Sequence, residues 1–494
     1  MPRNKLRAYG LPFILLFLLA VSILLFFNDL IQRPAIQGFI LDRASEALGF
    51  HIRAEALRLD VGNGLALKAR GFRAWSRDGT EEVEAASLEI GLNGRELIRG
   101  RIVPTRFHLE RPRVLLNPGG PALPGPSVLW IPKGTFLEKL AALGSVSVSG
   151  GEVRLSTIPY HLEALRFSLS ERGDATDAFV VNLHGEVVSG EDRVPFSIRG
   201  TLHPRAGGTA LETRAALAVE IRNLPAIWLS HYAPFGITGG RLSAEFDLTG
   251  SLGATVRARG SLNLNHFKFF ITGGERRKDY RFPRATLAFE ALRKGWRLQF
   301  PRLELRMAGA SVNAGLVLDL KERNNPWLAL RISHPFMDLQ TFKALMPTPI
   351  LPEAVEDCYV PLFSKADVRI ESLRLKGTLS QIKHLDRPAN YERFSLKLRM
   401  KEGLALQGLG GMPVEKVAGS LLMQRGGLSL EGVSGRFGTS FFKKGSLRIP
   451  DLFREPSRFS IAVEGDYDLE DLARQAELEF TPAGVRDVVS KIDY

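Results

Sequence analysis

The chain contains a single cysteine, Cys358, among its 494 residues. One thiol can form neither an intramolecular disulfide nor a cysteine-based zinc site. The nine histidines are never closer than nineteen residues, so no pair has the spacing of a metal-binding motif. The sequence therefore predicts no metal centre.

Nucleotide-binding signatures are missing as well. No glycine is followed by lysine, which excludes a P-loop, and no G-x-G-x-x-G follows a strand and opens a helix. Asp and Glu fall mostly at polar positions of alternating segments, where solvated surface charges are expected. These absences predict a protein that is not an enzyme and that has no resident cofactor.

Acidic residues are fewer than basic ones, 53 against 66, and the formal net charge is +13. The basic residues alternate with apolar ones instead of forming a stripe with interleaved aromatics, which favours a solvated face over nucleic-acid binding. Two denser clusters stand out: Arg99, Arg101, Arg106, Arg111 and Arg113, then Arg276, Arg277, Lys278, Arg281 and Arg284. Because the first cluster comes early in the exported part, proximity to anionic lipid headgroups is an alternative reading of it.

Residues 11–27 lack any charge and read LPFILLFLLAVSILLFF. Seventeen helical residues span about 25 Å, the lower limit for a bilayer core. Arg3, Lys5 and Arg7 precede them, so the positive-inside rule predicts a cytoplasmic tail over residues 1–10 and a single-pass anchor over residues 11–31. The predicted anchor positions are Leu11, Phe13, Leu16, Leu19, Ile23 and Phe27.

A cleaved signal peptide is the competing reading of this segment, but no small-x-small cleavage site follows the apolar run. Either reading places the remainder of the chain outside the cytoplasm. The sequence thus predicts that the bulk of the protein is exported.

Beyond the anchor, apolar and polar residues alternate almost to the end, which is the period of β-strands with one apolar and one wet face. In residues 241–249 the even positions are apolar and the odd ones polar. The apolar positions that we select as candidate ligand-facing residues are Leu242, Phe246, Leu248, Trp296, Leu298, Phe300, Leu303, Leu305, Met307, Leu316, Leu318, Phe394, Leu396 and Leu398.

Helices are expected in few places. Residues 34–50 carry Ile36, Phe39, Ile40, Ala44, Ala47 and Leu48 on one helical face, and Gly49 is a plausible stop. Short helices are also expected near residues 136–143, 224–232 and 352–359. Residues 117–127 read NPGGPALPGPS, which can form neither a ladder nor a helix.

These patterns divide the chain into a helix plus β region over residues 32–116, a Pro/Gly linker over residues 117–135, and a repetitive β region over residues 136–494. Its end is compatible both with a segment of a longer protein and with a short member of its kind. Strand spacing of 9 to 13 residues predicts about 35 to 40 strands. The alternation fits one long sheet and an array of separate sandwiches equally well, since both need one apolar face.

Several segments resemble one known family. The strands LRLDVGNGLALKARGFRAW, EAASLEIGLN and LIRGRIVPTRFHLERPRVLL, behind an anchor and a short amphipathic helix, are similar to the N-terminal region of AsmA-like proteins. The later ITGGRLSAEFDLTGSL and VAGSLLMQRGGLSLEGVSGRFGTSFFKKGSLRIP resemble the repeating regions of the same superfamily, which includes TamB-like and YhdP-like proteins.

The resemblance implies a mainly β fold: a transmembrane helix, then a long antiparallel sheet curled along its length into a groove, with a few short helices. It implies an inner-membrane protein of Gram-negative bacteria whose bulk lies in the periplasm. Phospholipids would be the cargo, carried between inner and outer membranes, with outer-membrane or envelope proteins as partners at the C-terminal end.

Two other functions are compatible with the same sequence. A periplasmic scaffold could assist outer-membrane protein assembly by pairing its sheet edges with client strands, without conducting lipid. A tethered array of β-sandwiches could serve as a binding module. All three expectations depend on what covers the apolar face.

Overall fold

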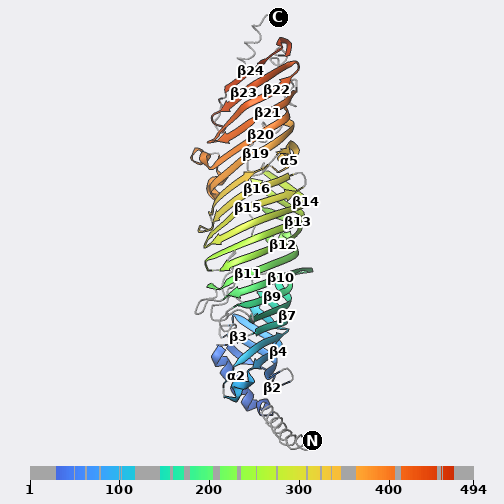
Figure 1. Cartoon of the computed structure of the whole chain (residues 1–494), viewed down its shortest axis with the longest axis vertical. Helices are drawn as coiled ribbons and strands as arrows, with labels where there is room; N and C mark the ends of the chain where they lie inside the picture. Colours follow the sequence, from blue (N-terminus) through green and yellow to red (C-terminus); the bar gives the residue numbers. More distant parts are fainter. Residues whose placement is uncertain are drawn as a thin grey trace, which may run out of the picture. The chain divides into compact units, whose positions relative to one another are not determined.

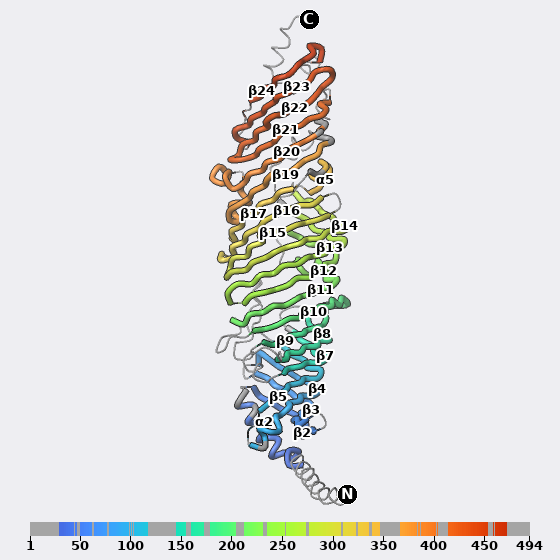
Figure 2. Tube along the Cα trace, viewed as in Figure 1, coloured from blue at the N-terminus to red at the C-terminus, as the bar shows by residue number. Residues whose placement is uncertain are grey.

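The computed structural model in Figures 1 and 2 describes residues 29–471, except for residues 49, 62–63, 77–78, 100, 102, 117–144, 156–159, 172–177, 204–211, 231–234, 252, 274–275, 308–309, 323–324, 335, 346–362, 386, 406–412, 453–457 and 459. Outside the described residues lie residues 11–28 of the predicted anchor, the Pro/Gly linker, Cys358 and the helices expected near 136–143 and 352–359. Within the described part of the chain, no helix is both long and apolar enough to cross a membrane.

The described chain is mainly β with few helices, as the alternation predicts. It forms two compact units: Met1–Arg222 with Leu248–Gly253, and Asn223–Asp247 with Ala254–Tyr494. In each unit the strands are joined by hydrogen bonds into a sheet, and the colours of Figure 2 follow its strands along the chain.

The first unit begins with a helix and continues with short, then longer, strands. Its elements are α2 (Pro34–Leu48), β1 (Phe50–Arg53), β2 (Ala56–Asp60), β3 (Ala66–Ser76), β4 (Glu81–Leu92), α3 (Gly94–Ile98), β5 (Pro104–Glu110), β6 (Arg113–Leu116), β7 (Ser145–Leu155), β8 (His161–Glu171), β9 (Phe179–Ser189), β10 (Asp192–His203) and most of β11 (Arg214–Pro225).

Helix α2 confirms the predicted helix but presents a different face to the sheet. Ile40 and Leu41 pack against the buried cluster on β2–β4 that includes Leu57. Phe39 is instead 61% exposed, with the Arg43 guanidinium 5.7 Å from its ring centroid. The expectation that Phe39 shares the packed face is therefore wrong, because the helix rests on the sheet through Ile40 and Leu41.

The sheet of the first unit is mixed rather than purely antiparallel. Strand β7 pairs in parallel with both β5 and β6, as in Phe107 opposite Val146 and Val114 opposite Val153. A parallel pair needs a crossover of a dozen or more residues, and residues 117–144 separate β6 from β7. The predicted all-antiparallel sheet is wrong at this point.

The second unit contains the longest strands. Its elements are η2 (Ala226–Leu229), most of β12 (Gly236–Ser251), β13 (Thr255–Gly273), β14 (Arg276–Lys294), β15 (Arg297–Met307), β16 (Ala310–Asp319), β17 (Trp327–Ser333), β18 (Phe336–Asp338), α5 (Leu339–Leu345), β19 (Phe363–Thr378), α6 (Leu379–Lys383), η5 (Pro388–Arg393), β20 (Phe394–Ala405), β21 (Val414–Gln424), β22 (Gly427–Phe437), β23 (Ser440–Ile449) and β24 (Ser460–Asp466).

From β13 to β24 the pairing is antiparallel, and β17 and β18 lie end to end along β19. The described chain holds 24 strands in all, fewer than the strand spacing predicts. The difference arises because several strands are long: β13 and β14 have 19 residues each and continue through irregular positions that look like strand ends in the sequence.

One such irregularity crosses neighbouring strands of the second unit. His266 on β13 has φ +49°, and Gly240 on β12 has φ +108°. A Cβ on Gly240 would lie 2.6 Å from the Cα of Phe267, so only glycine fits there. Along β13 the apolar positions shift by one at His266, yet Leu264 and Phe267 still pack in one cluster. The irregular residue therefore keeps both apolar runs on the same face of a bent strand.

Candidate functional site

The apolar residues of the second unit are aligned across strands, not only along them. In antiparallel pairs, directly opposed residues bring their Cβ atoms within about 5.5 Å. One unbroken row of opposed apolar residues crosses the sheet from β14 to β23: Phe289, Leu303, Ala314, Ile332, Leu373, Leu396, Met423, Leu428 and Ile449. We call this set the central row.

Further rows flank the central row on the same face. One comprises Phe300, Leu316, Leu330, Leu375 and Phe394; another comprises Ile370, Leu398, Leu421, Leu430, Leu447 and Ile461; a short one comprises Leu298, Leu318 and Leu328. Leu305 opposes Leu287 and Val312, and Met307 opposes Ala285 and Ala310. Together with the central row, these residues form the apolar face of the second unit.

Most sequence-selected residues from β15, β16 and β20 therefore lie on one face. Phe246 extends it, because its ring lies 6.2 Å from that of Phe289. Leu242 is buried, with 8% of its surface exposed, and Leu248 is half-buried. Trp296 departs from the expectation. It follows Gly295 in the turn before β15 and is 59% exposed, so it is not part of the apolar face.

Sequence reasoning missed several members of the rows, among them Ile332, Leu373, Leu421 and Met423. The signal was present for Ile332 and Leu373, which sit at apolar positions of alternating segments, whereas Leu421 and Met423 lie in an unbroken apolar run. What the sequence could not supply was the register that sets these residues directly opposite the selected ones.

The apolar face is only partly covered by protein. In β15, β16 and β17, all of which the structure describes, no side chain is buried, and Leu303, Leu305 and Leu316 are half-buried. Strands in the interior of a sandwich bury their inward side chains against a second sheet. The middle of the second unit therefore presents a broad apolar surface that its own side chains do not close.

Protein does cover the face at particular places. Helix η2 closes one corner, where Ala226, Ile237 and Phe267 are buried together. Helix α5 covers another, where Leu339 packs with Ala366 and Val368 on β19. The apolar face is therefore covered by η2 and α5 at these two places and left uncovered over β15, β16 and β17.

The opposite face of the same strands carries ion pairs. Glu304 lies between Arg302 and Arg306, at 3.2 and 2.5 Å. Hydrogen bonds from Arg306 and then from Arg302 lower the pKa of the Glu304 carboxyl, and burial opposes the shift. Glu371 pairs in the same way with Lys397 and Arg399, at 2.8 and 3.0 Å. The alternation therefore separates an apolar face from an ionic one.

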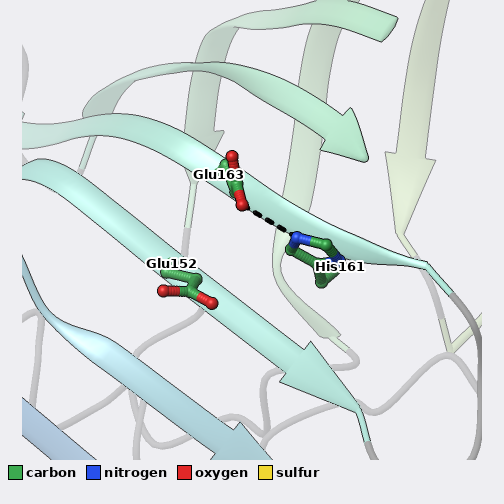
Figure 3. A group of neighbouring side chains, drawn as sticks. All are labelled: Glu152, His161 and Glu163. Atoms are coloured by element: carbon green, nitrogen blue, oxygen red, sulfur yellow. Dashed lines mark hydrogen bonds and ion pairs between the residues drawn. The ribbon is translucent and has the colours of Figure 1, made fainter. Parts of the chain in front are cut away.

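In the first unit, a second candidate is a group of possible metal ligands drawn in Figure 3. Glu152 on β7 and His161 and Glu163 on β8 place one ligand atom each within 4.8 Å of one another. His161 Nε2 lies 2.9 Å from Glu163 Oε1, the contact dashed in Figure 3. All three side chains are half-buried.

Arginines already occupy these carboxylates. Arg113 and Arg154 pair with Glu152, and Arg193 pairs with Glu163. The hydrogen bond from His161 is the largest cause that lowers the pKa of the Glu163 carboxyl, and Arg193 adds to it. A divalent cation would have to displace three guanidinium groups from two carboxylates, so we interpret this group as an ion-pair network.

A shallow hollow lies beside this network. It is lined by Glu82, Glu84, Arg113, Leu115 and Arg154, and its mixed charges form no catalytic arrangement that we recognise. No family model, no curated protein and no solved structure matches the chain.

Proposed function

We propose that the protein holds phospholipids by their acyl chains on the apolar face of the second unit. The observation that carries the proposal is the absence of any buried side chain in β15, β16 and β17, although their apolar residues stand in continuous rows. A lipid tail that covers such a row gains roughly 0.8 kcal/mol for each methylene removed from water. Acyl chains are the natural cover for a surface of this chemistry.

The rows also favour movement of the cargo. Successive members of the central row lie one strand apart, about 4.8 Å, and nearly all are Leu, Ile, Met or Phe. Adjacent positions therefore offer an acyl chain nearly equal free energies. We infer that the face acts as a track along which a lipid slides, the polar headgroup remaining in water.

We further propose that the chain belongs to the AsmA-like family and is anchored in the inner membrane by residues 11–31, with its β region in the periplasm. The apolar N-terminal segment, the basic residues before it and the Gly-bounded strand motifs support this placement. The sheet would then form a groove that carries phospholipid between inner and outer membranes.

Photo-crosslinking tests the proposal. A photoreactive residue at Leu305 in the full chain, exposed to phospholipid vesicles, should capture lipid. The same residue at Arg306, the next position on the ionic face, is the matched control and should capture little. Equal capture at both positions, or none at Leu305, would refute the proposal.

A second candidate function rests on a different observation. Strand β24 pairs with β23, and among the described residues its Ile461 and Val463 are 56% and 51% exposed. An exposed apolar strand can pair with a strand of another protein. A scaffold that assists client assembly would use β24 and would tolerate charges on the apolar face, whereas a lipid carrier would not.

A further inference from the structure

The sheet of the second unit contains a notch at one end of its strands. Strand β14 meets β15 only from Ala285 onward, so residues 276–284 extend beyond that partner. At roughly 3.3 Å per residue, this extension is about 30 Å long. The hairpin of β15 and β16 ends where Met307 opposes Ala310. Among the described residues, no strand pairs with the β14 extension on this side.

On the far side of the hairpin the ladder extends again. Strand β18 continues along β19 to the pair of Asp338 and Asp367. Strands β19 and β20 run further still, to the pair of Phe363 and Ala405. The notch thus lies between the β14 extension and the extensions of β19 and β20.

Helix α5 spans this notch. It follows β18 directly, and Figure 1 draws it at the same side of the sheet as the labels of β13 and β14. Leu339 is buried against Ala366 and Val368, and Phe342 packs in the same cluster with Leu398 and Met400. The helix therefore lies on the apolar face of β19 and β20.

The other contact of α5 is to the β14 extension. The Lys278 amine donates a 2.9 Å hydrogen bond to the carbonyl oxygen of Lys343 in the last turn of the helix. Lys278 also lies 5.4 Å from the ring centroid of Tyr280, which is buried on the apolar face. A cation at a helix C-terminus is favourable, so this contact fastens α5 across the notch.

The helix is short and depends on its packing. It has seven residues, too few to be stable without packing. Its first turn is capped by Asp338, whose carboxylate accepts bonds from the Thr341 amide and hydroxyl at 2.8 and 2.6 Å. Burial in this position lowers the pKa of the Lys343 amine, which opposes closure. A position of α5 away from the sheet would return this amine to water.

We propose that the notch is a lateral port through which the acyl chain of a phospholipid enters or leaves the apolar face, and that α5 is its gate. This inference rests on the proposed lipid function. When α5 is in place, it packs on Leu398 and Met400; when it lifts, both side chains become more accessible to an acyl chain.

A disulfide that locks α5 provides the test. Leu339→Cys with Val368→Cys, in a Cys358→Ser background, joins the helix to β19. The matched control is Ser429→Cys with Arg448→Cys, which are directly opposed on β22 and β23 on the face opposite the apolar one, away from α5. The readout is the rate at which a photoreactive residue at Leu305 captures phospholipid from vesicles of phosphatidylethanolamine and phosphatidylglycerol.

We expect oxidation to slow capture at least severalfold in the locked protein and reduction to restore it, with the control pair unaffected. Asp338→Ala, which needs no disulfide, should loosen α5 and speed capture about fivefold, the usual effect of a lost helix cap. Unchanged rates in both the locked protein and Asp338→Ala would overturn the gate. Absence of capture at Leu305 in every variant would instead overturn the lipid function.

Discussion

The Asp471 carboxylate accepts hydrogen bonds from both the backbone amide and the hydroxyl of Ser440, at 2.9 and 3.0 Å. It accepts two more from the amide and hydroxyl of Thr439. Both Asp471 and Ser440 are buried. Together with the bonds of Asp468 to the same two residues, these bonds fasten the residues that follow β24 to the start of β23.

This carboxylate predicts a pH-dependent loss of local structure. Burial raises the pKa of Asp471, but the bonds from Ser440 and Thr439 outweigh burial and leave it below its usual range. Because the pKa is lower in the folded state, the ionised carboxylate stabilises the fold at pH values above its unfolded pKa of about 3.9. That stabilisation is lost as the pH falls through the folded pKa. Hydrogen exchange at the Thr439 and Ser440 amides should accelerate there.

Asp471→Asn is the control for this prediction. It keeps the shape of the side chain but has no carboxylate to protonate, so its exchange should be faster at neutral pH and lack the acid transition. Identical acid profiles in the two proteins would show that Asp471 does not hold this corner.

The sequence predicted which residues share a face better than it predicted their partners. Leu303 and Leu305 alternate with charged residues, and this period alone assigns them to the apolar side. Shifting a strand by two residues preserves the alternation, so the pairing of Leu303 with Ala314 could not be read from it.

Bends and coverage were harder still to predict. His266 adopts positive φ without being glycine, and the one-residue shift of the apolar positions there does not by itself give that φ. Leu242 and Leu305 look alike in the sequence, yet only Leu242 is buried, because burial depends on elements distant in the chain. Helix α5, with seven residues, was too short for its periodicity to be recognised.

Placing a charge on the apolar face should abolish lipid capture while the protein stays folded. Leu305→Asp puts a carboxylate where an acyl chain is proposed to lie, and an unpaired charge in an apolar contact is strongly unfavourable. We expect capture at a photoreactive residue at Leu316 to fall at least tenfold. The protein should still fold, because position 305 is half-buried and the charge keeps contact with water.

Thr286→Asp is the matched control, since Thr286 opposes Arg306 on the ionic face. It introduces the same charge and should leave lipid capture unchanged. If Leu305→Asp instead left both lipid capture and the assembly of client proteins intact, the scaffold function would be favoured.

Gly240→Ala should destabilise the second unit strongly. The φ of +108° disfavours any Cβ, and the added carbon would lie 2.6 Å from the Cα of Phe267 and 2.8 Å from the His266 carbonyl oxygen. Backbone atoms cannot move aside without shifting β13, so we expect a loss of about 2–4 kcal/mol in the free energy of unfolding. Denaturant titration of the full chain measures it.

Gly295→Ala is the comparison for that substitution. Gly295 also has positive φ, but a Cβ there would meet no atom within 4 Å. Its cost should be limited to about 1–2 kcal/mol of backbone strain. Equal losses at the two positions would contradict a steric role for Gly240.

Glu304→Gln should have little effect on either stability or lipid capture. The substitution removes the charge that pairs with Arg302 and Arg306, but both guanidinium groups are largely exposed. Surface pairs of this kind contribute about 0–1 kcal/mol. Thermal unfolding and capture at Leu305 should both stay near wild type; a large loss of capture would mean that the ionic face takes part in binding.

Lys343→Met should hold α5 more tightly in the notch. Burial lowers the pKa of the Lys343 amine, which means that the closed position disfavours its charge, and methionine keeps an apolar stem without that charge. The Lys278 bond survives, because it goes to the backbone carbonyl of residue 343. We expect α5 amides to exchange about two- to threefold more slowly and phospholipid to load onto the apolar face more slowly by a similar factor.

Ala344→Met, at an exposed position of the same helix, is the control and should change neither rate. Faster exchange in Lys343→Met would show that the lysine side chain itself fastens α5, in contradiction to the balance proposed here.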